Sequence, residues 1–177
     1  MPDPSLSQAL QEAYASAPSN EVIYHTLEIR HPAFTTPIRV VRDNQDITAR
    51  LEAAAPENGG ELVTFVGFAF DLVRPEVTSN GIPQCTIEID NVSREILANI
   101  ELAVTDTDNP IEVTYREYLA SDLNTGPEND PPMTLTIIKI TADVFRVRAV
   151  ASFADIGNRR FPREEYTAER FPGLINQ

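Results

Sequence analysis

Alternation of apolar and polar residues with a period of two is the feature that most constrains the fold of this chain. The run Val144–Phe153 shows it clearly, because one face collects Phe145 and four further apolar side chains while the other carries Arg146 and Arg148. Such alternation is typical of an antiparallel strand with one buried face. Similar runs recur between residues 20 and 153, so we expect strands to dominate this part of the chain.

Helical spacing of apolar residues is predicted at only two places. The first helix covers residues 5–17, with Ser5 as the expected N-cap and Pro18 at its end. The second is a small inserted helix over residues 92–102. Since no regular alternation of strands and helices follows, we predict a mainly β fold, either an antiparallel β-sandwich or a partly closed barrel.

The pattern divides the chain into three parts: an N-terminal helix or arm over 1–19, a β-rich domain over 20–153, and an extended C-terminal arm over 154–177. The arm has no periodicity of its own but repeats an Arg-Phe-Pro element, and aromatic residues and arginine are enriched at interface hot spots. The predicted subunit-interface residues are Arg160, Phe161, Tyr166, Arg170, Phe171 and Leu174. Whether this arm docks on a neighbour or folds back over its own domain stays open.

The net charge of -13 argues against direct nucleic-acid recognition, because binding to phosphates requires a basic surface. Strong acidity is commonly a solubility feature. It also suits a ring subunit that lines a DNA channel, since DNA then slides without sticking. No apolar run approaches the length of a membrane span, and no signal-peptide pattern begins the chain, so a soluble protein that starts in the cytoplasm is expected.

No catalytic motif, metal site or cofactor site is predicted from the residues. The single cysteine, Cys85, lies on an alternating strand and is expected to be a buried, inert thiol, although a nucleophile remains the alternative. Both histidines are expected to be structural. Glu88 and Asp90 on one strand face, and the oxygen-rich turn 106–109, are open to two interpretations, a bound hard cation or ordinary turn chemistry.

A family resemblance rests on residues at both ends of the β region and in the arm. The carrying segments are 22–29, 151–155, 158–162 and 166–174, the last with the sequence Tyr-Thr-Ala-Glu-Arg-Phe-Pro-Gly-Leu. Together they resemble a family of phage and prophage minor tail proteins labelled only as a domain of unknown function. The order of elements is also similar to the N-terminal domain of the tail-tip protein L family of lambda-like phages. That family's iron–sulfur segment is not implied here, because this chain has one cysteine.

The resemblance implies a structural minor tail protein and not an enzyme. Such a subunit forms a homo-oligomeric ring, a trimer or a hexamer, in the tail tip or baseplate of a bacteriophage virion. Its implied partners are itself, the distal tail protein at the tube end, and the central hub or fibre protein, with host cytoplasm as the place of assembly. The alternative is a β-sandwich module that binds host-surface carbohydrate, for which exposed aromatic platforms are expected and tryptophan is absent.

Overall fold

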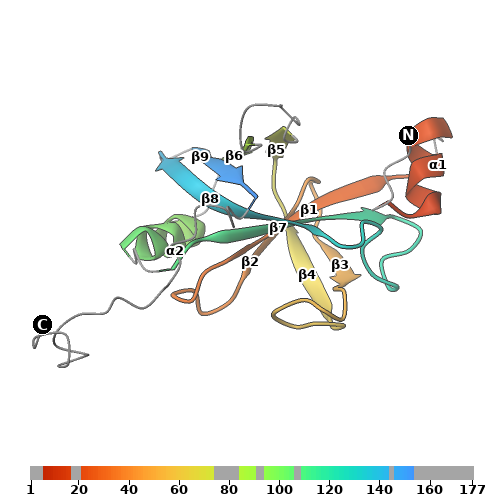
Figure 1. Cartoon of the computed structure of the whole chain (residues 1–177), viewed down its shortest axis with the longest axis horizontal. Coiled ribbons are helices and arrows are strands. Elements are labelled where there is room, and N and C mark those ends of the chain that lie inside the picture. The colour runs from red at the N-terminus through yellow and green to blue at the C-terminus, as the bar shows by residue number, and fades with distance from the viewer. Residues whose placement is uncertain are drawn as a thin grey trace, which may run out of the picture.

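The computed structural model describes residues 6–16, 21–73, 84–90, 94–105, 109–143 and 146–153. Within these ranges lie two helices, α1 (Gln8–Ser16) and α2 (Arg94–Thr105). The strands are β1 (Ile23–Arg30), β2 (Ile38–Val41), β3 (Ile47–Arg50), β4 (Leu62–Gly67), β5 (Phe70–Val73), β6 (Gln84–Asp90), β7 (Glu112–Leu119), β8 (Met133–Ala142) and β9 (Arg146–Ser152). Long β1, β7 and β8 cross the middle of the molecule, with α1 and α2 at opposite ends (Figure 1).

The nine strands form one mixed sheet in the order β3-β4-β2-β1-β7-β8-β9-β6-β5. All neighbours are antiparallel except β2 and β4, which pair in parallel over two positions, Val40 with Val66 and Val41 with Gly67. The predicted mainly β class and both predicted helices are confirmed. The strands make a single curled sheet that does not close into a barrel. Strands β8 and β9 pair antiparallel, as a tight turn near residues 142–143 predicts.

The sheet curls because the chain passes from β4, near one edge, to β5, at the other edge, through only Phe68 and Ala69. The two ends of the sheet therefore lie close together, and Phe68 N–H donates to the Val41 carbonyl (2.9 Å). Gly67 is required at this junction, since a Cβ there would lie 2.9 Å from the Asp43 carbonyl oxygen. A glycine inside an apolar run predicts a bulge or turn, and here it marks the change from β4 to β5.

The concave side of the curl holds the main apolar core. Strands β1, β2 and β5–β9 all contribute side chains, and α2 adds Ile100 and Ala103. The buried members are Leu27, Ile29, Ile38, Val40, Phe70, Cys85, Ile87, Ile89, Ile100, Ala103, Ile111, Val113, Tyr115, Leu135, Val147, Ala149 and Ala151. We call this the inner core.

A second core lies on the opposite face of the β1–β7 layer. The β3–β4 hairpin folds over this face and buries Phe65 against the ring of Tyr118, with ring centroids 6.0 Å apart. Its buried members are Val41, Ile47, Ala49, Leu51, Val63, Phe65 and Tyr118. We call this the outer core. Strand β1 is consequently buried on both faces from Thr26 to Arg30.

Two local expectations need correction. The N-cap of α1 is Ser7 and not Ser5, because Ser7 Oγ accepts from Leu10 N–H (3.1 Å) while Leu6 forms an isolated bridge with Asn129 that keeps the chain extended up to that point. The second concerns residues 62–70, whose continuous apolar run predicts a buried strand, whereas β4 is buried on one face only. Leu62 and Val66 are 48% and 43% exposed, since no described segment covers the outer side of the hairpin.

Candidate functional site

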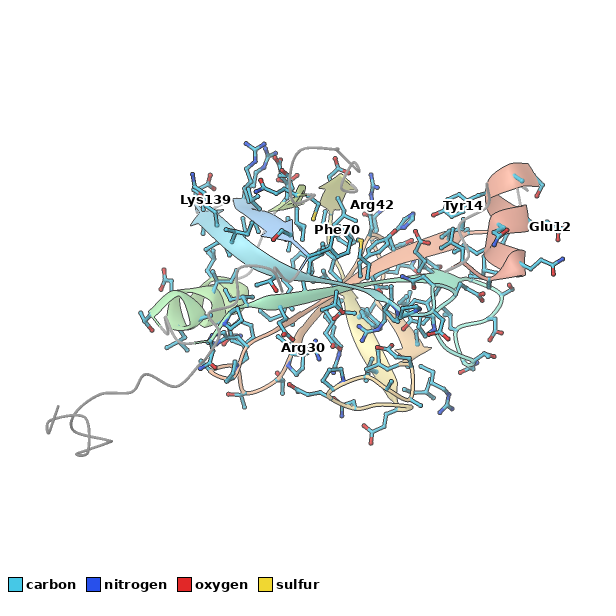
Figure 2. All side chains as sticks on the ribbon, in the orientation of Figure 1. Glu12, Tyr14, Arg30, Arg42, Phe70 and Lys139 are labelled. Carbon is cyan, nitrogen blue, oxygen red and sulfur yellow. The ribbon has the colours of Figure 1, made fainter. Side chains whose placement is uncertain are left out.

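Charged side chains at alternating positions of three strands meet on the outer face of the sheet, next to the outer core. The β1–β7 register sets Arg30 opposite Glu112, and the β1–β2 register sets Glu28 opposite Arg39. Arg116 lies on the same face of β7. Glu28 and Arg116 are fully buried, so this part of the sheet is covered although its side chains are ionic. In Figure 2, Arg30 and the inner-core residue Phe70 lie on opposite sides of this layer.

Glu28 is the centre of the cluster. Its Oε2 accepts a hydrogen bond from Arg39 Nε at 2.8 Å. Its Oε1 lies 3.5 Å from Arg30 Nε and 3.6 Å from Arg116 Nη2 but accepts no hydrogen bond from the described residues, so these two contacts are charge–charge interactions. Three guanidinium groups thus surround one buried carboxylate.

Two further carboxylates balance the charge of this cluster. Glu52, from the β3–β4 loop, accepts two hydrogen bonds from Arg116, at 2.6 Å from Nε and 2.7 Å from Nη2. Glu112 accepts from Arg30 Nη2 at 3.0 Å. Burial alone would lower the pKa of Arg116, but the hydrogen bond to Glu52 and the charge of Glu28 outweigh it, so the pKa is raised. The guanidinium therefore stays charged, and the cluster is neutral with three of each sign.

The β3–β4 loop is held over this network from two sides. Asn58, in a left-handed conformation (φ 55°), accepts a hydrogen bond from Arg39 Nη2 at 2.9 Å. The start of the loop is fixed by Glu52 and by Arg50, whose backbone N–H donates to the Leu123 carbonyl at 2.8 Å. These contacts hold the β3–β4 loop over the outer face of the sheet and connect it to the β7–β8 loop. The two loops form the walls of a hollow on this face.

A cleft lies between these walls, and Arg30 lies in its floor. It consists of two adjoining hollows of about 540 and 290 Å³ that share Arg30 and Pro56. Six of the chain's prolines line it, namely Pro32, Pro56, Pro110, Pro127, Pro131 and Pro132. Its charged lining residues are Arg30, Glu52, Glu57, Glu112 and Asp130, one arginine against four carboxylates. We call this the proline-lined cleft.

A separate polar cluster docks α1. Glu117 Oε1 accepts hydrogen bonds from Tyr115 (2.5 Å) and from Tyr14 of α1 (3.0 Å). His25 Nδ1 lies 2.7 Å from the Tyr115 hydroxyl oxygen, and Asn129 Oδ1 accepts from Glu117 N–H at 3.0 Å. Because Glu117 is 1% exposed and these partners anchor a helix and a loop around it, the arrangement is that of a structural joint.

The six predicted interface residues of the C-terminal arm, Arg160, Phe161, Tyr166, Arg170, Phe171 and Leu174, all lie outside the described residues. Among the other candidates, Cys85 is buried in the inner core, and burial raises its thiol pKa, as expected of an inert cysteine. Three strands separate it in the sheet from His25 of β1.

The carboxylates on β6 are engaged by arginines of β9. Asp90 Oδ1 lies 2.5 Å from Arg146 Nε, and Glu88 Oε1 lies 2.9 Å from Arg148 Nε. Glu88 and Asp90 therefore form surface ion pairs with arginines, which replaces their interpretation as ligands of a cation. Over the described ranges no group of three or more His, Cys, Asp and Glu side chains is placed to hold a metal ion. The second candidate, Asp106–Asp108, is outside those ranges.

The buried network was missed by reasoning from the sequence, although a signal was present. Strand β1 places Glu28 and Arg30 at alternating positions, and β7 places Glu112 and Arg116 likewise. Charges at alternating positions of a single strand predict a solvent-exposed face, whereas here opposite charges lie across from each other on paired strands. Opposite charges in register on neighbouring strands indicate a paired polar layer that a third segment can cover.

Comparison with known protein families gives one match. The family model is that of a domain of unknown function, DUF1833, and it covers residues 9–166. The chain belongs to the DUF1833 family. The matched range of this DUF1833 domain takes in both cores, the proline-lined cleft and the first Arg-Phe-Pro element, and it ends before the second. This family is consistent with the resemblance to minor tail proteins, but its label specifies no function.

No curated protein matches the DUF1833 chain. Neither of the two described helices is both long and apolar enough to cross a membrane.

Proposed function

We propose that this chain is a structural subunit of the tail tip of a long-tailed phage, in a ring between the end of the tail tube and the central hub or fibre protein. The observation that carries the proposal is a described domain with two apolar cores of its own, followed in the sequence by an arm rich in aromatic residues and arginine. Among the described residues the last member of either core is Ala151, and β9 ends at Ser152. A packed domain with such an arm suits a subunit that contacts its neighbours through the arm.

The described domain has the properties that such a subunit requires. Two cores on opposite faces of one layer and a buried ionic network make a stiff body, because each face of the β1–β7 layer is packed or hydrogen-bonded. A stiff body with an arm can hold neighbours in fixed orientations, which is what ring closure demands. Phe161 and Phe171 each precede a proline, which restricts them to extended backbone suited to docking.

The described surface offers little support for the alternative of carbohydrate binding. Large exposed aromatic side chains are limited there to Tyr14 and Phe153, which are 45% and 41% exposed. Tyr14 is engaged by Glu117 at 3.0 Å, and the chain has no tryptophan. A flat aromatic platform of the kind that stacks on sugar rings is thus lacking in the described ranges.

In this proposal the partners are further copies of the chain, three or six in a ring, together with the distal tail protein and the hub or fibre protein. The subunit functions in the virion tail tip after assembly in the host cytoplasm. It carries out no chemistry of its own. The net charge of -13 suits a ring around the DNA path, because like charge keeps DNA from adhering to the subunit.

The experiment that tests this function is imaging of purified tails that carry a density label fused to the N-terminus of the subunit. The expected result is label density at the tip only, in three or six symmetric copies. Tails that carry the same label on the tube protein serve as the control for detection along the whole tail. Labelled subunit along the tube, or its absence from purified tails, would overturn the proposal.

A further inference from the structure

The charge of the proline-lined cleft is opposite to that of one short segment of the same chain. Of the four carboxylates among its described lining residues, Glu52 and Glu112 belong to the neutral ionic network, so the excess negative charge comes from Glu57 and Asp130, which are exposed. Residues 1–153 carry the whole net charge of -13, since residues 154–177 hold four arginines and four carboxylates. Within that arm the run Arg159-Arg160-Phe161-Pro162-Arg163 bears three positive charges and no negative one. We call this run the RRFPR element.

The shape and chemistry of the cleft also match this element. Six prolines give apolar walls on which an aromatic ring can pack, and Phe161 is presented between arginines. Pro162 restricts Phe161 to extended backbone, so little conformational entropy is lost when the ring is bound. Arginine forms strong, geometrically defined pairs with carboxylates, which the rim supplies on both sides.

The described part of β9 ends near the cleft. Its last paired residue, Ser152, lies opposite Thr136 of the antiparallel strand β8. Thr134 and Pro132, two and four residues before Thr136, line the cleft. In the described residues no strand pairs with Met133–Leu135 on that side. Five residues lie between Phe153 and Arg159 in the sequence, and this stretch of chain can reach up to about 20 Å.

We propose that in the free subunit the proline-lined cleft binds the RRFPR element of its own chain. Phe161 packs against the proline walls, and the flanking arginines face Glu57 and Asp130. A tether this short gives an effective concentration of about a millimolar, far above that of a second copy in dilute solution. This inference concerns the isolated chain and is independent of the proposed function. Release of the element from its own cleft would be one step of assembly.

Cysteine cross-linking in the full-length chain tests the contact. Cys85 is 2% exposed, so introduced surface cysteines react selectively with a short bis-maleimide. The test variant carries Ala54→Cys in the cleft wall and Asn158→Cys, which directly precedes the RRFPR element and leaves Phe161 in place. The control carries Lys139→Cys, exposed on the far half of β8 and distant from Arg30 in Figure 2, with the same Asn158→Cys. A third sample mixes the two single variants, Ala54→Cys and Asn158→Cys.

The expected result is an intrachain cross-link in the test variant that forms about tenfold faster than in the control, with no cross-linked dimer in the mixture. Circular dichroism on each variant verifies that it is folded. Equal rates in test and control would overturn the inference, because the element would then not favour the cleft. A dimer in the mixture without an intrachain product would also overturn it, since the element would occupy a neighbour's cleft.

Charge reversal provides an independent test of the same contact. Glu57→Lys with Asp130→Lys, added to the test variant, is expected to slow the intrachain cross-link about tenfold, and Arg160→Glu with Arg163→Glu is expected to restore most of the rate. The matched control is Glu12→Lys with Glu101→Lys, which changes the net charge equally at exposed positions of the two helices. If the two pairs of lysines slow the reaction equally, charge recognition by the cleft is contradicted.

Discussion

The two faces of the β1–β7 layer are both buried, but one is apolar and the other is ionic. On the inner face, Leu27 and Ile29 enter an apolar core shared by seven strands and α2. On the outer face of the same strand, Glu28 and Arg30 are buried just as deeply but in an ionic network. The comparison teaches that alternation along a strand does not separate a core face from a water face. Here it separates two covered faces of different chemistry.

The apolar face and the ionic face contribute differently to the stability and shape of the domain. Apolar burial gives stability in proportion to area and places few demands on geometry. A buried ion network gains little net stability, because desolvation offsets most of its Coulomb energy, but loss of one member leaves an uncompensated charge. The outer network therefore contributes mainly by holding the neighbouring loops in fixed positions, and adds little net stability. It holds the β3–β4 loop by Glu52 and Asn58 and thereby shapes the proline-lined cleft.

The largest effect is expected from Arg116→Ala. This change leaves Glu28 and Glu52 without their shared partner and should lower the free energy of unfolding by about 3–5 kcal/mol. Urea denaturation followed by circular dichroism measures it. Arg148→Ala, which removes an exposed ion pair with Glu88, is the matched control and should cost less than about 1 kcal/mol. Equal losses for the two arginines would show that the network is solvated.

On the inner face, Leu27→Ala should lower the free energy of unfolding by about 3 kcal/mol through lost contacts and a cavity. Leu27→Met is the control that keeps the volume, and it should cost less than about 1.5 kcal/mol. The same denaturation experiment applies. A difference of this size between the two variants would support a dry, apolar core on the inner face. If the inner face were hydrated, both substitutions would change the free energy of unfolding only slightly.

Cys85→Ser should cost about 1–2 kcal/mol at neutral pH, because a hydroxyl replaces a thiol in the inner core. Since burial raises the pKa of Cys85 above its unfolded value of about 8.5, the native chain loses stability as pH rises beyond that value. The serine variant has no such titration, so its deficit should shrink between pH 7 and pH 10. A deficit that is constant over this range would mean that the thiol is not desolvated.

The smallest effect is expected from Tyr118→Phe in the outer core at neutral pH. The hydroxyl donates to the Arg50 carbonyl at 3.1 Å, so its loss should cost about 1 kcal/mol. Burial raises the pKa of this phenol well above its ordinary value near 10, so the unfolded chain ionises first. The native chain should therefore lose more stability above pH 10 than the phenylalanine variant, which retains only the alkaline loss due to Cys85 and other groups. Parallel curves for the two proteins in alkaline urea titrations would contradict this burial.

Much of the fold follows from the sequence because strand alternation and helix spacing are local signals. Both helices arise close to the expected positions, and strands make up most of the described part of residues 20–153, as the alternation predicts. The parallel β2–β4 pair was not predictable in this way, because it depends on how far the sheet curls before Phe68 and Ala69 connect its ends.

The candidate site was less predictable for the same reason. Cys85 was correctly expected to be a buried thiol, because an apolar neighbour at every second position is a local signal. The partners of Glu28, in contrast, come from β2, from β7 and, through Arg116, from the loop that carries Glu52. No spacing along the chain brings these residues together. The role of the arm remains a prediction from composition and resemblance.

The central claim is that the fold resides in the β-domain and that assembly depends on the arm. Expression of residues 1–157 in a phage that lacks the gene tests it most directly, with infectious particles counted beside the thermal transition of the purified fragment. The account predicts a cooperative transition near that of the full chain and no rescue of infectivity. An aggregated or molten fragment would contradict the first half, and a folded fragment that restores infectious particles would contradict the second.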